Sequence, residues 1–549
     1  MLLRIVTGCV LALTVVLNSA AQQTKGVAPA RGDFQISGTL VDAITGQPVA
    51  RARVAVAPVT QRDNFTTIVT REDGRFLFAD LAPGKYTLTA QARGYLLQAF
   101  DQHDTYSSSL AVGPELDSSH LLFRIPPEGA ISGVVTDEAG EAVRGAQVML
   151  YFTGLSAGVE ATRQRGQIVT DDEGAYHFGH LPPGHYLVAV SARPWYAWHG
   201  SNAGGAESSQ PGNPLLDVAY LVTFYGGVTD AGSATRIALG RGEKVTADVN
   251  LQPVPALHIR LDAESADPAR RTYPVLQRRV LDAPPIQVQT ETRIAPDSRN
   301  PAEGQGIQEI VGVPPGHYVV RTYTVVDGAS EWGGAREVDV TGNGEIDKSQ
   351  ALAYVPVSAT LHFESGAPAR QGFLQFLNKK TREGFAERIG ADGEAVFKQG
   401  LLPGTYEISL SSSVDLYVKS ISATGASVTG RTIEIRPGTA VKLSIGAVRG
   451  QGAITGTALR EGKSFAGAMI VLVPADPAHN QVLFRRDQSD SDGTFTLANV
   501  VPGAYTLLAL EDGWELEWMK AEVLRNYLGR GTTVQVQPNG KYDIKVAVQ

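Results

Sequence analysis

A serine flanked by glycines has the sequence context of a catalytic nucleophile. The segment GLSAG places Ser156 in a G-x-S-x-G pattern, in which a strained turn from a strand into a helix exposes the serine hydroxyl. The residues that follow, VEATRQRGQIVTDDEG, predict a return into another strand instead of that helix, and no Asp and His follow in a hydrolase layout. We therefore expect a loop serine and no catalytic residue, with a hydrolase as the second alternative function.

Three histidines could bind a transition metal. His177, His180 and His185 fall within nine residues, which could suit zinc. The alternation of its strand predicts that His177 points outward, and His180 lies at the end of that strand. Lys85, Thr405 and Ala504 hold the place of His185 in three other copies of the repeat described below, so we expect an exposed position there and no zinc site.

An acidic loop could bind calcium. The segment DVTGNGEID offers Asp339, Asn343 and Asp347 as oxygen ligands, without the complete EF-hand pattern. The same residue types are the best turn formers, so an ordinary turn is the alternative. We expect no cofactor and keep these three residues as weak calcium candidates.

A cluster of aromatic residues is the best candidate for binding a ligand. Trp195, Tyr196 and Trp198, followed by His199, stand where the alternating strand has ended, and Phe224 and Tyr225 could belong to the same surface. Exposed aromatic rings stack on sugar faces or anchor protein contacts. Burial against a neighbouring domain is the alternative reading of the cluster.

The elements that must position these residues are β-strands of a repeated unit. The repeat is clearest from Gly74 to Tyr86, which reads GRFLFADLAPGKY. It recurs as GAYHFGHLPPGHY, GEAVFKQGLLPGTY and GTFTLANVVPGAY, and a degenerate fifth copy ends in VPPGHY. Apolar residues recur at every second position on both sides of Pro-Gly, which predicts two strands joined by a hairpin or a sheet-to-sheet corner. A spacing of about 90 to 130 residues fits an array of small domains.

The tyrosine after the turn is the most regular feature of the repeat. It stands two residues after the turn glycine in all five copies, as Tyr86, Tyr186, Tyr318, Tyr406 and Tyr505 after Gly84, Gly184, Gly316, Gly404 and Gly503. Burial alone would accept Phe, Leu or Val. We therefore expect its hydroxyl to bond to main chain a few residues upstream, as in the tyrosine corner of Greek-key sandwiches.

The sequence predicts an all-β chain, a tandem array of about five Greek-key (transthyretin- or Ig-like) β-sandwiches with one short helix near the C-terminus. The expected parts are a signal peptide at 1–21, a linker at 22–32, and sandwiches at 33–126, 127–254 with a long loop at 193–214, 255–353, 354–449, and 450–549 with a helix at 515–528. The links between the sandwiches are short, so we expect a semi-rigid rod.

Composition and the N-terminus indicate an exported protein. The 549 residues carry a net charge of −8, which offers no basic surface for nucleic acid. Arg4, an apolar run and Ser19-Ala20-Ala21 have the form of a signal peptide, and an uncleaved membrane anchor is the alternative. Cys9 is the only cysteine, so removal of the leader excludes disulfides and thiol chemistry. No later run is long enough to span a bilayer.

The repeat also carries a family resemblance. ISGVVTDEAGEAVRGAQVML from Ile131, together with the D-x-x-G-x-[FY]-x-F-x-x-L-P-P-G-x-Y pattern, resembles the carboxypeptidase regulatory-like domain. The resemblance implies a transthyretin-like, seven-stranded sandwich, found in tandem on exported bacterial proteins. It is good in the first, second and fifth units; the fourth keeps only ADGEAVF and LLPGTY, and the third has Gln308 in place of the aromatic. The family name does not imply peptidase activity.

These observations favour an exported, non-catalytic binding or scaffold protein of the cell envelope or exterior. Analogy with similar sandwiches suggests carbohydrate as the ligand, bound by Trp195, Tyr196, Trp198 and Tyr225. A protein–protein adhesion or spacer module, with an envelope protein as partner, is the alternative. The sequence does not predict the oligomeric state.

Overall fold

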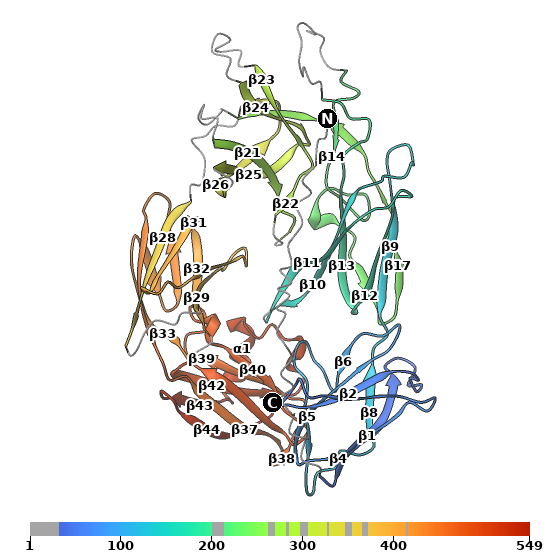
Figure 1. The fold of residues 1–549 in the computed structure, drawn as a ribbon, viewed down its shortest axis with the longest axis vertical. Helices are drawn as coiled ribbons and strands as arrows, with labels where there is room; N and C mark the ends of the chain where they lie inside the picture. The colour runs from blue at the N-terminus through green and yellow to red at the C-terminus, as the bar shows by residue number, and fades with distance from the viewer. Residues whose placement is uncertain are drawn as a thin grey trace, which may run out of the picture.

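The computed structural model describes residues 32–156, 158–199, 213–261, 270–281, 285–296, 306–326, 329–345, 354–364, 372–412 and 415–549. It confirms the predicted fold class: five β-sandwiches follow one another along the chain (Figure 1). The expected signal peptide at 1–21, most of the linker at 22–32 and most of the loop at 193–214 lie outside the described residues. Among the described residues, no helix is long and apolar enough to cross a membrane.

The first sandwich shows the plan of the others. Its first strand, β1 (Phe34–Asp42), pairs antiparallel with β4 (Arg75–Leu81) and parallel with the closing strand β8 (Leu121–Ile125). The strand after Pro-Gly, β5 (Gly84–Gln91), lies in the other sheet beside β2 (Arg53–Pro58). The repeated stretch is therefore a corner that carries the chain from one sheet to the other, which decides between the two readings of the sequence.

The remaining strands repeat this plan. The first sandwich is completed by β3 (Thr66–Val69), β6 (Gln98–Ala99) and β7 (Leu110–Val112). The second contains β9 (Gly129–Thr136), β10 (Gln147–Ser156), β11 (Val159–Val169), β12 (Ala175–Leu181), β13 (Gly184–Ser191), β14 (Val218–Tyr220), β15 (Thr223–Phe224), β16 (Ile237–Leu239), β17 (Lys244–Thr246), β18 (Val249–Asn250) and β19 (Pro253–Pro255). The third contains β20 (Leu257–Leu261), β21 (Arg270–Arg278), β22 (Ile286–Gln287), β23 (Glu291–Pro296), β24 (Gly306–Val313), β25 (Gly316–Val326), β26 (Ala329–Val340) and β27 (Gly344–Glu345).

The fourth sandwich contains β28 (Val355–Phe363), β29 (Gly372–Asn378), β30 (Gly384–Arg388), β31 (Glu394–Leu401), β32 (Gly404–Ser412), β33 (Tyr417–Thr424), β34 (Ala426–Thr429), β35 (Thr432–Ile435) and β36 (Val441–Val448). The fifth contains β37 (Gly452–Arg460), β38 (Lys463–Ser464), β39 (Met469–Pro474), β40 (Arg485–Gln488), β41 (Thr494–Val500), β42 (Gly503–Leu510), β43 (Thr532–Val536) and β44 (Lys541–Ala547). In each of the five, the first strand lies between the strand before the corner and a parallel closing strand.

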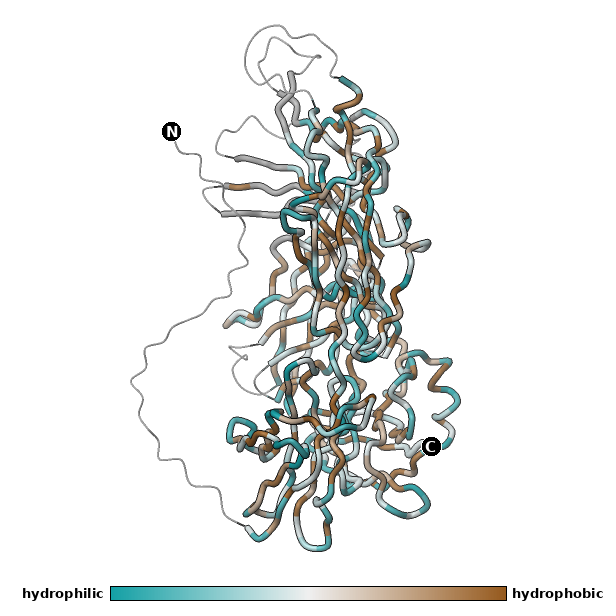
Figure 2. The backbone as a smooth tube through the Cα atoms, turned by 90° about the vertical axis from the view of Figure 1, so that its right-hand side faces the viewer, coloured by the Kyte–Doolittle hydropathy of each residue, from teal (hydrophilic) through white to brown (hydrophobic). Residues whose placement is uncertain are grey.

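Each sandwich buries its own apolar core. In the first, Phe76 and Phe78 before the corner and Leu88 after it are at most 3% exposed, as their alternation predicts. Separate clusters of the same kind fill the other four sandwiches. Figure 2 shows hydrophobic stretches along the whole height of the molecule, in keeping with several separate cores.

The corner tyrosines make the expected bond to main chain. Each hydroxyl donates to the carbonyl oxygen four residues upstream, over 2.6–2.8 Å: Tyr86 to Ala82, Tyr186 to Pro182, Tyr318 to Pro314, Tyr406 to Leu402 and Tyr505 to Val501. The glycine between them has φ of 151–159° in all five copies. Since that conformation strongly favours glycine, the backbone of the corner explains the glycine of the P-G-x-Y motif, and the hydrogen bond explains its tyrosine.

A β-bulge precedes every corner. The register between the first strand and the strand before the corner shifts in all five sandwiches. The bulged residue has φ between 54° and 74°, at Asp80, His180, Gly312, Gly400 and Asn499. Asp, Asn and Gly adopt this left-handed conformation most easily, and His180 occupies the same backbone position.

The five sandwiches close on themselves, so the expectation of a semi-rigid rod is wrong. The first and fifth sandwiches lie side by side at one end, and the second, third and fourth complete the circuit (Figure 1). Hydrogen bonds join residues about 400 positions apart, such as Ser109 and Asp490. Short links allowed either arrangement, and contacts between distant surfaces decide for the closed one.

The C-terminal helix is shorter than predicted. α1 spans Ala521–Leu528, whereas the predicted helix began at 515. A single 3-10 turn, η4 (Gly513–Glu515), precedes it, and residues 516–520 are not helical. The apolar residues at helical spacing do pack on the sheet of the fifth sandwich, but Trp518 is held by tertiary contacts outside a helix.

Candidate functional site

The aromatic segment of the second sandwich forms a tight turn. The amide of Ala197 donates to the Pro194 carbonyl over 3.1 Å, which places Trp195 and Tyr196 at the two central positions of the turn. Trp195 is 82% exposed and Trp198 is 51% exposed. His199, by contrast, is buried. Two tryptophans, three positions apart in the chain, are therefore exposed to solvent.

The tyrosine of the turn is an anchor. Its hydroxyl and that of Tyr220 donate to the two carboxylate oxygens of Glu138, the second over 2.9 Å. Partial burial, which raises the pKa of Glu138, is outweighed by these hydrogen bonds, and the net pKa lies below its usual value. Burial and the bond to Glu138 raise the pKa of Tyr196 to about 12. The turn is thus tied to a carboxylate that stays ionised at neutral pH.

Two further aromatics are more buried than the tryptophans of the turn. Tyr225 is partly buried and packs against the core of the second sandwich, and Phe224 is 2% exposed in a cluster with Val280 and Ile286 of the third sandwich. The binding of a ligand by Tyr225 together with Trp195 stays a prediction. Leu215, which is 78% exposed, lies beside the turn, because the Trp198 amide donates to the Leu216 carbonyl over 2.8 Å.

The three histidines that the sequence offered as zinc ligands occupy separate, exposed positions. His177 and His185 point outward from their strands, as predicted for His177, and His180 sits at the bulge, where it contacts Glu128. Ser156 ends β10 and pairs with Val159 across a hairpin, so the segment GLSAG has none of the strand-to-helix geometry of a nucleophile elbow.

The calcium candidates have protein partners. Asp339 accepts from His317 Nδ1 over 2.7 Å, and the Asn343 side-chain oxygen accepts from the His258 amide over 2.8 Å. Asp347 lies outside the described residues. The described part of this loop therefore acts in local hydrogen bonding.

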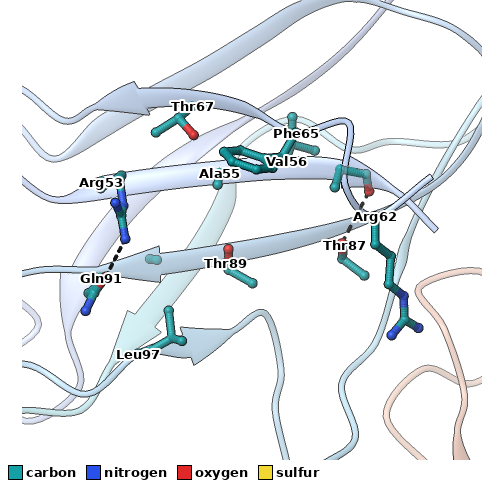
Figure 3. A pocket seen from close by; sticks show the side chains of 12 residues that line it. Arg53, Ala55, Val56, Arg62, Phe65, Thr67, Thr87, Thr89, Gln91 and Leu97 are labelled. Atoms are coloured by element: carbon teal, nitrogen blue, oxygen red, sulfur yellow. Dashed lines mark hydrogen bonds between the residues drawn. The ribbon is translucent and has the colours of Figure 1, made fainter. Parts of the chain in front are cut away.

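A shallow groove lies on the outer face of the first sandwich. It has a volume of about 320 Å³ and runs over β2, β3 and β5 (Figure 3). Phe65, 63% exposed, lies over the strands among threonine hydroxyls, and Arg53 donates to Gln91 over 2.6 Å at one end. One exposed ring among hydroxyl, amide and guanidinium groups is a set suited to a polar ligand.

Polar side chains close the circuit between the first and fifth sandwiches. Lys85 makes an ion pair and hydrogen bonds with Asp490 and Thr494, with Asp492 at 3.6 Å. The Ser109 amide donates to Asp490 over 2.7 Å, and the Ala111 amide donates to the Ser491 hydroxyl over 2.8 Å. The acidic turn around Asp490 thus holds the first sandwich.

One arginine lies at the centre of the same contact. Arg486 donates to Asp104 over 2.7 Å, and its guanidinium carbon lies 4.6 Å from the centroid of Tyr106 and 4.9 Å from that of Trp518. His103 stacks on Trp514, with centroids 5.0 Å apart. These contacts join aromatic and charged groups of the first and fifth sandwiches.

The second sandwich also touches the fifth. The Met519 amide donates to the Gly158 carbonyl over 3.0 Å, and a side chain at Gly158 would meet the Trp518 ring at 2.4 Å. A cavity of about 340 Å³ lies where the three sandwiches meet, lined by Tyr106, Leu155, Arg163, Arg486 and Trp518 among others. Trp518, which lies within the segment predicted as helix, thus forms part of the contact between domains, and no feature of the sequence predicted this role.

A cluster at the junction of the second and third sandwiches was also missed. His199, Asp217 and His258 bring one ligand atom each within 4.8 Å of one another, and they form the one such group of His, Cys, Asp or Glu found in the described part of the chain. They come from three separate segments, so no spacing pattern marks them.

Comparisons with solved structures give only distant likenesses. The chain is similar to the minor pilin GBS52 of Streptococcus agalactiae (13% identity, 40% of this chain and 96% of that chain covered, TM-score 0.21). It is also similar to the Bacillus anthracis TIE protein (11%, 97% and 76%, 0.16) and to the shaft pilin SpaA of Lactobacillus rhamnosus GG (10%, 40% and 97%, 0.19). At these identities and TM-scores the likenesses carry no functional argument.

The comparison with protein families is more specific. No curated protein matches the sequence significantly. Residues 35–109 and 130–203 both match the carboxypeptidase regulatory-like domain, whereas the resemblance of the fifth sandwich stays a prediction. The chain therefore carries two tandem domains of the carboxypeptidase regulatory-like family, within the first and second of its five β-sandwiches.

Proposed function

We propose that this chain is an exported, non-catalytic scaffold that holds a carbohydrate-binding surface on its second sandwich. The observation that carries the proposal is the exposure of Trp195 (82%) and Trp198 (51%) at a turn that the bond from Tyr196 to Glu138 holds in place. Large apolar rings are costly to leave in water unless they meet a partner, and flat aromatic rings suit the apolar face of a sugar. Export rests on the leader-like N-terminus, at 1–21.

The surroundings of the turn support a preformed surface. Tyr196 is tied to Glu138, and Arg193 pairs with Glu291 of the third sandwich. A turn held from two sandwiches loses little conformational freedom when a ligand binds, and this preorganisation favours affinity. Partner protein binding by the same rings is the alternative, because Trp is also frequent at the centres of protein interfaces.

The test is a glycan array with the purified chain and three single variants. Trp195→Ala is expected to abolish the strongest glycan signals. Phe373→Ala, which removes another exposed ring (45%) on the fourth sandwich, is the matched control and should keep them. Phe65→Ala should also keep them; its loss of signal instead would place the sugar in the groove of the first sandwich.

Other outcomes decide between scaffold functions. Absence of glycan binding, combined with capture of an envelope protein that Trp195→Ala abolishes, would replace carbohydrate by a protein partner. Turnover of esters or peptides by the purified chain would contradict the non-catalytic reading altogether.

A further inference from the structure

We propose that His199, Asp217 and His258 form a binding site for one divalent transition metal ion, with Zn²⁺ as the best fit. His199 Nδ1 lies 2.8 Å from Asp217 Oδ1, and His258 Nε2 lies 3.0 Å from Asp217 Oδ2. Two imidazoles and one carboxylate are a common ligand set for zinc. This inference is independent of the proposed carbohydrate binding.

The spacing of the three ligand atoms suits a tetrahedral ion. Metal–ligand bonds of about 2.0–2.1 Å place tetrahedral ligands about 3.3 Å apart. Asp217 Oδ1 lies 2.8 Å from His199 Nδ1 and 3.1 Å from His258 Nε2, and the two imidazole nitrogens lie within 4.8 Å of each other, so side-chain adjustments of about 1 Å reach that spacing. The side chains of Asp217 and His258 are 28% and 19% exposed, whereas that of His199 is 2% exposed. An ion seated here could therefore take water as its fourth ligand.

A second carboxylate supports His258. Glu309 is almost fully buried, and its Oε1 lies 3.9 Å from His258 Nδ1 and 3.4 Å from Arg260 Nε. Without an ion, Nε2 donates to the Asp217 carboxylate; on binding an ion through Nε2 the ring would keep its proton on Nδ1, which faces Glu309. Carboxylates in this position commonly orient metal-bound histidines. The Asn343 side chain holds the His258 backbone from the other side.

The backbone of β24 holds the other imidazole. Gly312 has φ of 74°, and a side chain at this position would come within 2.6 Å of His199 Nε2. The close approach of this glycine limits where the ring can move. The ring of His199 is thus confined with Nδ1 directed at Asp217.

The ligands come from both sides of a domain junction. His199 and Asp217 belong to the second sandwich and His258 to the third, and the Ala256 amide also donates to the Asp217 carbonyl over 2.9 Å. An ion bound by all three side chains would therefore stiffen the angle between these sandwiches. Calcium is disfavoured, because it prefers six to eight oxygen ligands.

The test is calorimetric titration of ZnCl₂ into the full chain after treatment with a chelator. We expect one Zn²⁺ per chain, no competition by Ca²⁺, and a higher melting temperature in Zn²⁺. His258→Ala should abolish this binding, and Glu309→Gln should weaken it by roughly 10- to 100-fold. His177→Ala, which removes an outward-facing histidine of the second sandwich, is the control and should bind as the unchanged chain does.

Two further measurements keep the proposal falsifiable if His258→Ala does not fold. Asp217→Asn keeps the shape of the side chain but removes its charge, and should bind zinc more weakly. X-ray absorption of the zinc-loaded unchanged chain should show two imidazole ligands. Failure of the unchanged chain to bind zinc, or equal binding by the chain and by His258→Ala, would overturn the proposal.

Discussion

Removal of Lys85 should open the contact between the first and fifth sandwiches. The Lys85 ammonium lies against Asp490 and Thr494 of the fifth sandwich, with Asp492 at 3.6 Å. Lys85→Ala leaves two neighbouring carboxylates without this cation in a partly buried place, since the Asp490 and Asp492 side chains are 15% and 22% exposed. Their repulsion and poor solvation both favour the open state.

The expected magnitude follows from the burial of the pair. Truncating one partner of a buried, hydrogen-bonded charge pair costs about 2–5 kcal/mol. The Lys85 side chain is 33% exposed, so solvent screens the pair and the lower limit applies. A loss of about 2 kcal/mol corresponds to a shift of roughly 30-fold in the equilibrium between closed and open states.

Hydrogen exchange measures this equilibrium at the contact itself. The amides of Ser109, Ala111 and Ser491 all donate across the two sandwiches, so they exchange only when the contact opens. We expect peptides that contain them to exchange roughly 30-fold faster in Lys85→Ala. Peptides from the core of the second sandwich should be unchanged.

Lys244→Ala is the matched control, because Lys244 is an exposed lysine of the second sandwich. It should leave exchange at Ser109 and Ser491 as in the unchanged chain. Equal protection of these amides in Lys85→Ala would refute the reasoning that this ion pair holds the two sandwiches together.

Two more predictions concern single sandwiches and their links. Tyr86→Phe removes the 2.8 Å bond to the Ala82 carbonyl and should lower the free energy of unfolding of the first sandwich by about 1 kcal/mol. Urea-dependent hydrogen exchange of the core amides of this sandwich measures the change. Unchanged protection of these amides would contradict a role for the hydroxyl. Glu407 is 1% exposed, and burial raises its pKa despite the bond from the Val482 amide. Its folded-state pKa therefore exceeds the unfolded value, so the contribution of Glu407 to stability is fully present below the usual value near 4.5 and is lost as pH rises through the folded pKa. Glu407→Gln should remove this loss, and melting curves from pH 4 to 7 that fall equally in both proteins would count against it.

The repeated corner explains why the sandwiches could be predicted from sequence. Both signals are local: alternating burial follows from the geometry of a single strand, and the P-G-x-Y motif follows from the backbone conformation of one turn. The tyrosine hydroxyl was predictable for the same reason, because its acceptor lies only four residues away. The helix was predicted too long because apolar spacing does not distinguish α1 from the irregular segment around Trp518.

The closed arrangement and the histidine cluster were not predictable, because both depend on contacts between distant segments. Lys85 stands at the repeat position of His185, which the sequence predicted to be exposed. Its partner Asp490 belongs to the fifth sandwich. Asp490 and Asp492 are turn formers in sequence, and nothing local shows their second role. His199 was grouped with the tryptophans, yet its partner Asp217 lies beyond the loop and His258 belongs to the next sandwich.

The central claim is that five sandwiches form a closed scaffold. Small-angle X-ray scattering of a purified chain of residues 22–549 tests this most directly. The closed arrangement of Figure 1 predicts a pair-distance distribution with a maximum dimension much shorter than that of five sandwiches in a row. An elongated distribution, as for five sandwiches in a row, would contradict it.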